Sequence, residues 1–215
     1  MPRTQLNQIN GMTDEYQVKK IGAYHMIGDD DYEPQRNNNF EVRIYFNEDD
    51  KLTTVANGTD IPLDLAQDCL TLSAVSVGQI ATEVGIIEVP YGNTKVKFAG
   101  LPSISNSDIV YTDYIGKATE RVIAAWQAQV FNPKTQKIGF ASKYKKAALL
   151  IETAPDGSRA RAWNLKGCWP SNVQYGAYDY SGGATRQITM TLAYDIAVPL
   201  DGVISESAMR SGTIE

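Results

Sequence analysis

Residues 187–198, QITMTLAYDIAV, have the clearest pattern in the chain and decide its fold. Large apolar side chains occupy every second position from Ile188 to Val198, and smaller or polar side chains fill the positions between them. Successive side chains of a strand point to opposite faces of a sheet. This period of two therefore predicts a β-strand with one buried face.

Three more strands precede this run in the C-terminal third, over residues 144–151, 160–169 and 173–180. The sequence Pro-Asp-Gly-Ser at 155–158 is typical of a turn between two apolar runs, with a glycine where positive φ is favourable. Pro170 has no N–H to donate to a sheet, so it is expected to end the second strand. Ser181-Gly182-Gly183 ends the third.

The N-terminal half adds three predicted strands, over residues 40–46, 69–77 and 109–111. The first is strongly patterned, because apolar side chains alternate from Phe40 to Phe46. A long polar insert, Asn47 to Asp60, follows it. The periodicity predicts an N-terminal arm (1–37), a β domain (38–199) and a C-terminal tail (200–215).

An extended hairpin is predicted from Gln79 to Leu101, with its turn at Pro90-Tyr91-Gly92-Asn93. Its apolar side chains have little to pack against locally, and such a hairpin usually binds a partner surface. The residues expected to make that contact are Val84, Ile86, Ile87, Val89, Pro90, Tyr91 and Asn93.

One helix is predicted before residue 133, where Asn132-Pro133 ends it. Thr112 or Asp113 is the expected cap. Apolar residues then recur at spacings of three and four, which places on one face Ile115, Ala118, Val122, Ala125, Trp126 and Val130. The helix is expected to pack on a sheet through Trp126 and Val122.

The composition is that of an ordinary globular protein: 215 residues, 43% hydrophobic and 21% charged, with a net charge of −5. An acidic balance argues against a protein that grips nucleic acid by its phosphates, which requires a basic surface. It does not argue against a protein that lets DNA slide past.

No catalytic, metal or cofactor site is apparent. The single histidine, His25, has no partner motif, and Cys69 and Cys168 are too isolated for a disulfide scaffold or a zinc site. The acidic residues 29–33 lack the spacing of an EF-hand, and Cys168 is expected to be buried in a strand. The N-terminus shows no signal peptide and no apolar run approaches the ~20 residues of a membrane helix, so a soluble cytoplasmic product is expected.

The chain from about Asn38 to Val198 resembles the tail tube proteins of contractile-tailed bacteriophages, which are related to the tubes of type VI secretion systems and R-type pyocins. The resemblance rests on the order of a Trp-bearing helix, KGCWPSNV (166–173) and ITMTLAYD (188–195). Its main residues are Trp126, Tyr144, Gly167, Trp169, Pro170 and Tyr194.

The lack of catalytic residues predicts no enzymatic activity and no cofactor. The resemblance implies a mainly β fold, a sandwich or barrel flanked by one α-helix. Six copies would form a ring, and the rings would stack into a hollow tube through the long hairpin. Expected partners are further copies of the chain, the tail sheath protein, baseplate and tail terminator proteins, the tape-measure protein and DNA passing through without specific binding. The expected location is the virion tail, assembled in the host cytoplasm.

Two alternatives stay open at this point. The chain is either the main tube subunit or an initiator or terminator at the baseplate or neck, which copy number separates. A closed-barrel binder of small molecules is a different class, and it requires a spacious apolar interior. For a tube, a neutral to acidic lumen is expected, with Gln187, Thr189 and Thr191 as candidate lining and Lys143, Lys145 and Lys146 at subunit contacts or on the outer surface.

Overall fold

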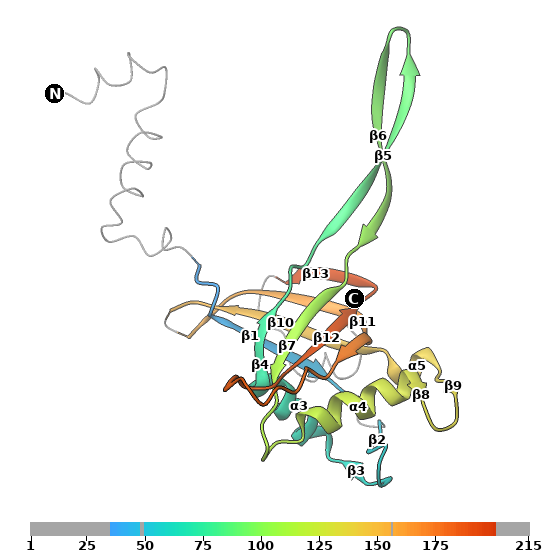
Figure 1. Cartoon of the computed structure of the whole chain (residues 1–215). Helices are drawn as coiled ribbons and strands as arrows, with labels where there is room; N and C mark the ends of the chain where they lie inside the picture. The colour runs from blue at the N-terminus through green and yellow to red at the C-terminus, as the bar shows by residue number, and fades with distance from the viewer. Residues whose placement is uncertain (1–34, 48–49, 156, 201–215) are drawn as a thin grey trace, which may run out of the picture. The chain divides into compact units, whose positions relative to one another are not determined.

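The computed structural model describes residues 35–47, 50–155 and 157–200. The chain divides into two units between Asn39 and Phe40, and every described helix and strand belongs to the second (Figure 1). His25, the acidic residues 29–33, most of the predicted arm and nearly all of the predicted tail lie outside the described residues.

An antiparallel seven-stranded sheet forms the centre of the second unit. Its path ends at β1 on one side and at β4 on the other, and β13 also pairs with β11. The strands in spatial order are β1 (Phe40–Tyr45), β10 (Lys146–Thr153), β11 (Arg159–Gln174), β12 (Gln187–Ala193), β7 (Ser107–Thr112) and β4 (Ala74–Val77), with β13 at Ile196–Leu200. The predicted mainly β fold with a flanking helix is confirmed.

Strand β11 joins the two halves of this sheet. Its first half pairs with β10 and β13, and its second half pairs with β12. The prediction that Pro170 ends the strand is wrong, because β11 continues to Gln174. A register shift between Pro170 and Asn172 absorbs the missing donor, since a proline is tolerated where the ladder is already irregular. The separate strand predicted over residues 173–180 does not form.

The alternating run at 187–198 forms two strands rather than one. Ile188, Met190 and Leu192 are fully buried, as the pattern predicts. The run breaks at Tyr194-Asp195, and in β13 Ile196 is 51% exposed. A break in a ladder changes which face a side chain occupies, so the alternation before Asp195 does not predict the face after it.

The described residues contain three helices, α3 (Leu63–Ser73), α4 (Thr119–Val130) and the short α5 (Ala141–Tyr144). The strand predicted over residues 69–77 is therefore wrong up to Ser73, and only Ala74–Val77 is extended. Helix α4 starts later than predicted, with Ala118 at its N-cap position instead of Thr112 or Asp113. Ile115 precedes the helix and is fully exposed.

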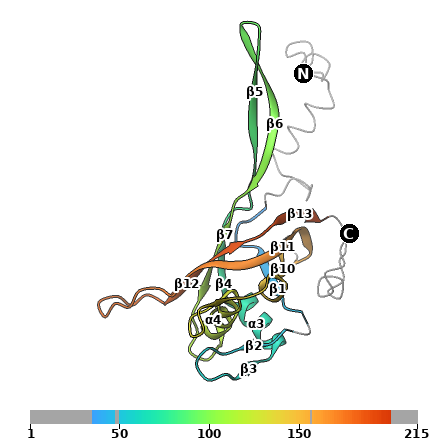
Figure 2. The same ribbon diagram turned by 90° about the vertical axis from the view of Figure 1, so that its right-hand side faces the viewer.

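The main core lies between the sheet and helices α3 and α4 (Figures 1 and 2). Its largest fully buried side chains come from both helices and four strands: Trp126, Tyr111, Ile44, Leu52, Leu70, Ile109, Ile123, Ile188, Met190, Leu192 and Val122. Leu52 comes from β2 (Leu52–Thr53), which pairs with β3 (Asp60–Ile61), so the polar insert contributes to the core. No helix in the described ranges has the length and apolar character needed to cross a membrane.

Candidate assembly surfaces

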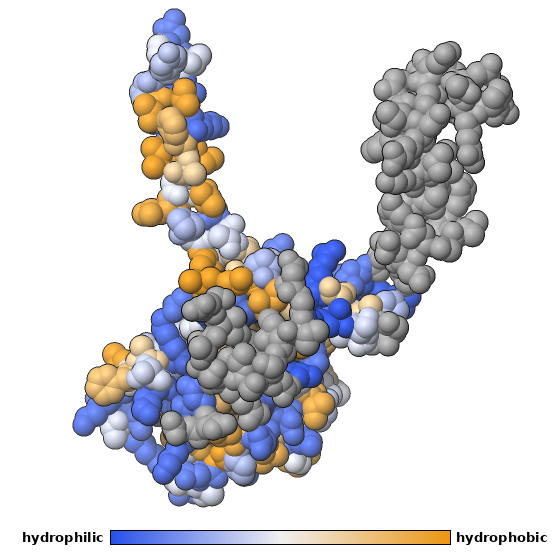
Figure 3. Space-filling model, turned by 180° about the vertical axis from the view of Figure 1, so that it is seen from behind, coloured by the Kyte–Doolittle hydropathy of each residue, from blue (hydrophilic) through white to orange (hydrophobic). Residues whose placement is uncertain are grey.

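The predicted hairpin is present as β5 (Thr82–Tyr91) and β6 (Thr94–Ile104), with Gly92 at φ +61° in the turn. It extends from the paired strands β4 and β7, away from the sheet (Figures 1 and 2). All residues of β5 are exposed. Figure 3 shows apolar side chains gathered along the hairpin, which is the largest apolar feature of that view.

The two faces of this hairpin differ in chemistry. Residues directly opposite each other across an antiparallel pair project from the same face. One face carries apolar side chains, from the pairs Tyr91 with Thr94, Val89 with Val96 and Ile87 with Phe98. The other face pairs Pro90 with Lys95, Glu88 with Lys97 and Ile86 with Ala99. Its charges come from Lys95, Lys97 and Glu88, and Lys95 binds Glu88 at 2.8 Å.

The residues that the sequence predicted for the stacking contact therefore do not all lie on one face of the hairpin. Ile87, Val89 and Tyr91 lie on the apolar face, while Ile86 and Pro90 lie on the charged face. Val84 lies beyond a register shift, and Asn93 is in the turn.

Val96 and Phe98 complete the apolar face, and sequence reasoning did not single them out. Counting the strand register outward from the Gly92 turn would have found them.

Three of the motif residues, Trp126, Tyr144 and Trp169, lie together at the C-terminal half of α4. The Trp126 side chain is fully buried, and its Nε1 donates to the Tyr144 carbonyl at 2.8 Å. Its ring meets Phe46 edge-on with centroids 5.7 Å apart, and Tyr144 meets Trp169 edge-on at 5.8 Å. Tyr144 lies in α5 rather than in the strand predicted from residue 144.

Of the remaining motif residues, Gly167 and Pro170 lie in β11, and Tyr194 lies at the break between β12 and β13. Gly167 has φ +71°, and a side chain there would clash with the Asp195 carboxylate. Lys145 Nζ donates to that carboxylate at 2.6 and 2.8 Å. Tyr194, which precedes Asp195, and Pro170, which follows Gly167 in β11, are both buried. Position 167 therefore requires glycine, because its φ is positive and the Asp195 carboxylate leaves no room for a Cβ atom.

Lys146 differs from the expectation for the three lysines at 143, 145 and 146. Its ammonium group is fully buried, 2.6 Å from the Asp50 carboxylate, and it also donates to the Lys143 carbonyl. Burial lowers the pKa of Lys146. Lys146 is therefore neither an outer-surface residue nor a subunit contact, because its ammonium group is buried inside the chain, where Asp50 offsets part of the desolvation. Lys143 is exposed, and Lys145 is the partner of Asp195.

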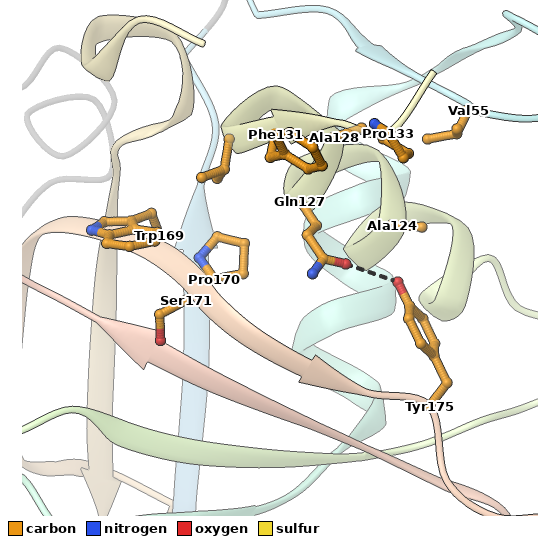
Figure 4. A pocket seen from close by; sticks show the side chains of 11 residues that line it. Val55, Ala124, Gln127, Ala128, Phe131, Pro133, Trp169, Pro170, Ser171 and Tyr175 are labelled. Carbon is orange, nitrogen blue, oxygen red and sulfur yellow. Dashed lines mark hydrogen bonds between the residues drawn. The ribbon is translucent and has the colours of Figure 1, made fainter. Parts of the chain in front are cut away.

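An apolar pocket of about 540 Å³ lies along the C-terminal half of α4 (Figure 4). Trp169, Pro170, Phe131 and Pro133 form much of its wall. The remaining lining includes Val55, Ala124, Ala128, Val130 and Ser171, together with Tyr175 and Gln127, whose side chains are hydrogen-bonded at 3.2 Å.

The face of β12 opposite the core carries the candidate lumen residues. Gln187, Thr189 and Thr191 pair with residues of β7, and Thr191 Oγ1 donates to Asp108 at 2.6 Å. Across β7 and β12 this face presents four neutral polar side chains, one valine and one carboxylate, from Gln187, Thr189, Thr191, Thr112, Val110 and Asp108. It presents no lysine or arginine within those two strands.

Solved structures share this fold. The chain aligns with TM-score 0.56 and 16% identity to a chain in the sheath/tube terminator of the PVC extracellular contractile injection system, covering 79% of this chain and 98% of that one. It aligns with TM-score 0.55 and 15% identity to a chain in the tube-terminating cap of the anti-feeding prophage, covering 79% and 93%. A chain in the PVC sheath–tube complex aligns with TM-score 0.52 and 17% identity, covering 78% and 91%.

No family model and no curated protein matches this sequence. At these identities the alignments establish the fold and nothing further. The predicted resemblance to contractile tail tubes is confirmed at that level, because the shared fold is found in structures of contractile injection systems.

Proposed function

We propose that this chain is a structural subunit of the tube of a contractile tail, assembled as hexameric rings that stack into a hollow conduit. The observation that carries the proposal is the one-sided apolar hairpin β5–β6. Ile87, Val89, Tyr91, Val96 and Phe98 share one face and are 40–75% exposed. The shared fold with chains of contractile injection systems supports the same reading.

An apolar ribbon of two strands is unstable alone in water. An isolated hairpin is at best marginally stable, and independent stability requires a third strand or a packed face. An exposed apolar surface of this kind marks an interaction site. In the proposed assembly, each hairpin is covered by the neighbouring ring, so that burial of its apolar face drives stacking.

The geometry of a tube follows from repeating contacts between identical subunits. A head-to-tail contact that closes gives a ring, and a second contact that does not close stacks the rings. The polar face of β7 and β12 is the proposed lumen lining, because it carries no cationic side chain that would neutralise phosphates and release counterions. DNA would then pass without being held. The sheath, the baseplate, a terminator and the tape-measure protein are the proposed partners in the virion tail, and we propose no catalytic activity.

A tube terminator is the second candidate. The observation favouring it is the pair of alignments to a tube-terminating cap and a sheath/tube terminator, which extend over 93% and 98% of those chains. A terminator would form a single ring at the end of a tube rather than tens of rings. A closed-barrel small-molecule binder is disfavoured, because the described sheet keeps β1 and β4 as separate ends.

Electron microscopy of the purified full-length chain tests the proposal. Long hollow tubes that grow with protein concentration are expected for the main tube subunit. Isolated rings that never stack would favour the terminator instead. A chain that stays monomeric at every concentration reached would overturn both candidates.

A further inference from the structure

The loop between β11 and β12, Tyr175–Arg186, has the composition of a recognition surface. Its sequence YGAYDYSGGATR is rich in tyrosine, glycine and serine, which dominate loops that bind other proteins. Tyr178 is 83% exposed and Tyr180 is fully exposed. The loop extends away from the sheet in Figure 2. Exposed tyrosines on a projecting loop are typical anchors of a protein interface.

Contacts within the chain hold this loop in one shape. The Asp179 carboxylate accepts hydrogen bonds from the Ser181 N–H and hydroxyl at 2.8–2.9 Å. Arg186 binds the Tyr175 carbonyl at 3.0 Å, and its guanidinium carbon lies 4.8 Å from the centre of the Tyr178 ring. A loop organised before binding loses less conformational entropy when it docks.

The base of the loop is attached to the first turn of α4. Arg186 Nη1 lies 2.6 Å from an Asp113 carboxylate oxygen and 3.0 Å from one of Glu120. The tip of the loop presents the Asp179 carboxylate between its two tyrosines. The hydrogen bonds from Ser181 lower the pKa of Asp179, so the tip stays negatively charged at neutral pH.

A complementary surface lies along the C-terminal half of α4. The pocket lined by Trp169, Pro170, Phe131 and Pro133 opens beside the short hairpin β8–β9 (Phe131–Asn132 with Lys137–Ile138). Exposed apolar side chains continue the surface, with Ile138 at 80% and Phe140 at 83%.

This second surface is basic. The sequence has no acidic residue between Glu120 and Glu152, although the whole chain is acidic. Lys145 and Lys146 of this stretch bind carboxylates within the chain. Lys134, Lys137 and Lys143 are exposed around the β8–β9 hairpin. An apolar pocket beside a hairpin that carries exposed lysines favours an aromatic side chain next to a carboxylate.

We propose that the Tyr178-Asp179-Tyr180 tip of one copy docks into the α4 pocket of a second copy, with a tyrosine ring in the pocket and Asp179 against Lys134 and Lys137. The proposal deepens the proposed function and rests on it, since it names the contact between neighbours within a ring. Arg186 attaches the loop to Glu120 in the first turn of α4, whereas the pocket lies along the C-terminal half of that helix. The contact therefore joins two different patches and is head-to-tail. Such a contact gives a ring when the rotation between successive copies closes.

Charge-reversal variants of the two surfaces, made in a chain that forms rings but does not stack, test this contact. The background is the triple variant Val89→Ser/Val96→Ser/Phe98→Ser, which removes the stacking face and is expected to leave single rings. In it, Tyr180→Ala and Asp179→Lys should each raise the concentration for half-assembly about tenfold or more, as hot-spot residues do. Sedimentation velocity gives that concentration. Lys134→Glu/Lys137→Glu should weaken assembly likewise, and combining it with Asp179→Lys should restore most of the loss.

The control is Thr185→Ala, which changes an exposed residue of the same loop outside the tip. All changed side chains are exposed, so circular dichroism melts should match those of the parent. Assembly of Tyr180→Ala and Asp179→Lys at the parental concentration overturns the contact and leaves the proposed function intact. A wild-type chain that never self-associates overturns the proposed function and the contact together.

Discussion

The indole Nε1 of Trp126 donates a 2.8 Å hydrogen bond to the backbone carbonyl of Tyr144. This bond joins the C-terminal half of α4 to the end of α5, just before β10 begins. The Trp126 ring packs edge-on against Phe46, and its N–H has a hydrogen-bond acceptor in the Tyr144 carbonyl. Trp126 is therefore a central element of the core rather than a surface anchor.

Replacing Trp126 by alanine is expected to lower the free energy of unfolding by about 3–5 kcal/mol, because it leaves a large cavity. Trp169→Ala is expected to cost clearly less, since Trp169 is only half-buried beside the pocket. Urea titration of both variants measures the difference. Equal losses, or a loss for Trp126→Ala well under about 1 kcal/mol, would contradict this assignment.

The buried pair of Lys146 and Asp50 predicts an asymmetry between single and double variants. Asp50→Ala leaves the Lys146 ammonium buried without its carboxylate, which typically costs about 3–5 kcal/mol. The double variant Asp50→Leu/Lys146→Met removes both charges and is expected to recover most of that loss. Urea denaturation of the wild type, Asp50→Ala and the double variant measures their free energies of unfolding. A double variant no more stable than Asp50→Ala would count against a charge imbalance.

The thiol of Cys168 is expected to be unreactive in the folded chain. Burial raises its pKa to about 12, and its hydrogen is donated toward the Leu165 carbonyl at 3.2 Å. The thiolate is the reacting form, so its population stays very small up to pH 9 and rises only as pH approaches the raised pKa. Iodoacetamide labelling followed by peptide mass spectrometry should show protection at pH 8 that denaturant removes. Labelling of folded protein at the rate of a free cysteine would refute it.

The two faces of the β5–β6 hairpin should behave differently in assembly. Val89→Ser/Val96→Ser/Phe98→Ser alters the apolar face and is expected to abolish long tubes while leaving folded subunits or rings. Lys95→Ser/Lys97→Ser alters only the charged face and serves as the matched control, which should still form tubes. Deleting residues 85–93 should have the same effect as the apolar variant. Electron micrographs showing long tubes from the apolar variant would remove the hairpin from the stacking contact.

Intact tubes should not retain DNA at physiological salt. The proposed lining offers hydroxyls, amides and the Asp108 carboxylate, and none of these displaces counterions from phosphate. Thr189→Lys/Thr191→Lys should create retention that falls steeply as salt increases. Co-sedimentation of labelled DNA with tubes measures both cases. Tight binding by wild-type tubes, or a lumen lined by lysine and arginine, would refute the proposal.

Periodic segments were predictable because their signal is local. The alternation from Ile188 to Leu192 and the spacing of Val122, Ala125 and Trp126 report which side of an element is buried, and the structure confirms both. The predicted mainly β fold and the exposed hairpin followed from the same kind of evidence. No local pattern distinguished Cys69–Ser73 as helix from strand, because a short apolar run is compatible with either.

The sequence by itself determined the mainly β class, the helix around Trp126 and the existence of an apolar hairpin, since each depends on the order of neighbouring side chains. Tertiary structure alone decided which hairpin residues share a face, that β11 passes through Pro170, and that Lys146 is buried against Asp50. These features depend on register and on residues as distant as positions 50 and 146. Such pairings arise only when the whole chain folds, so short-range periodicity does not contain them.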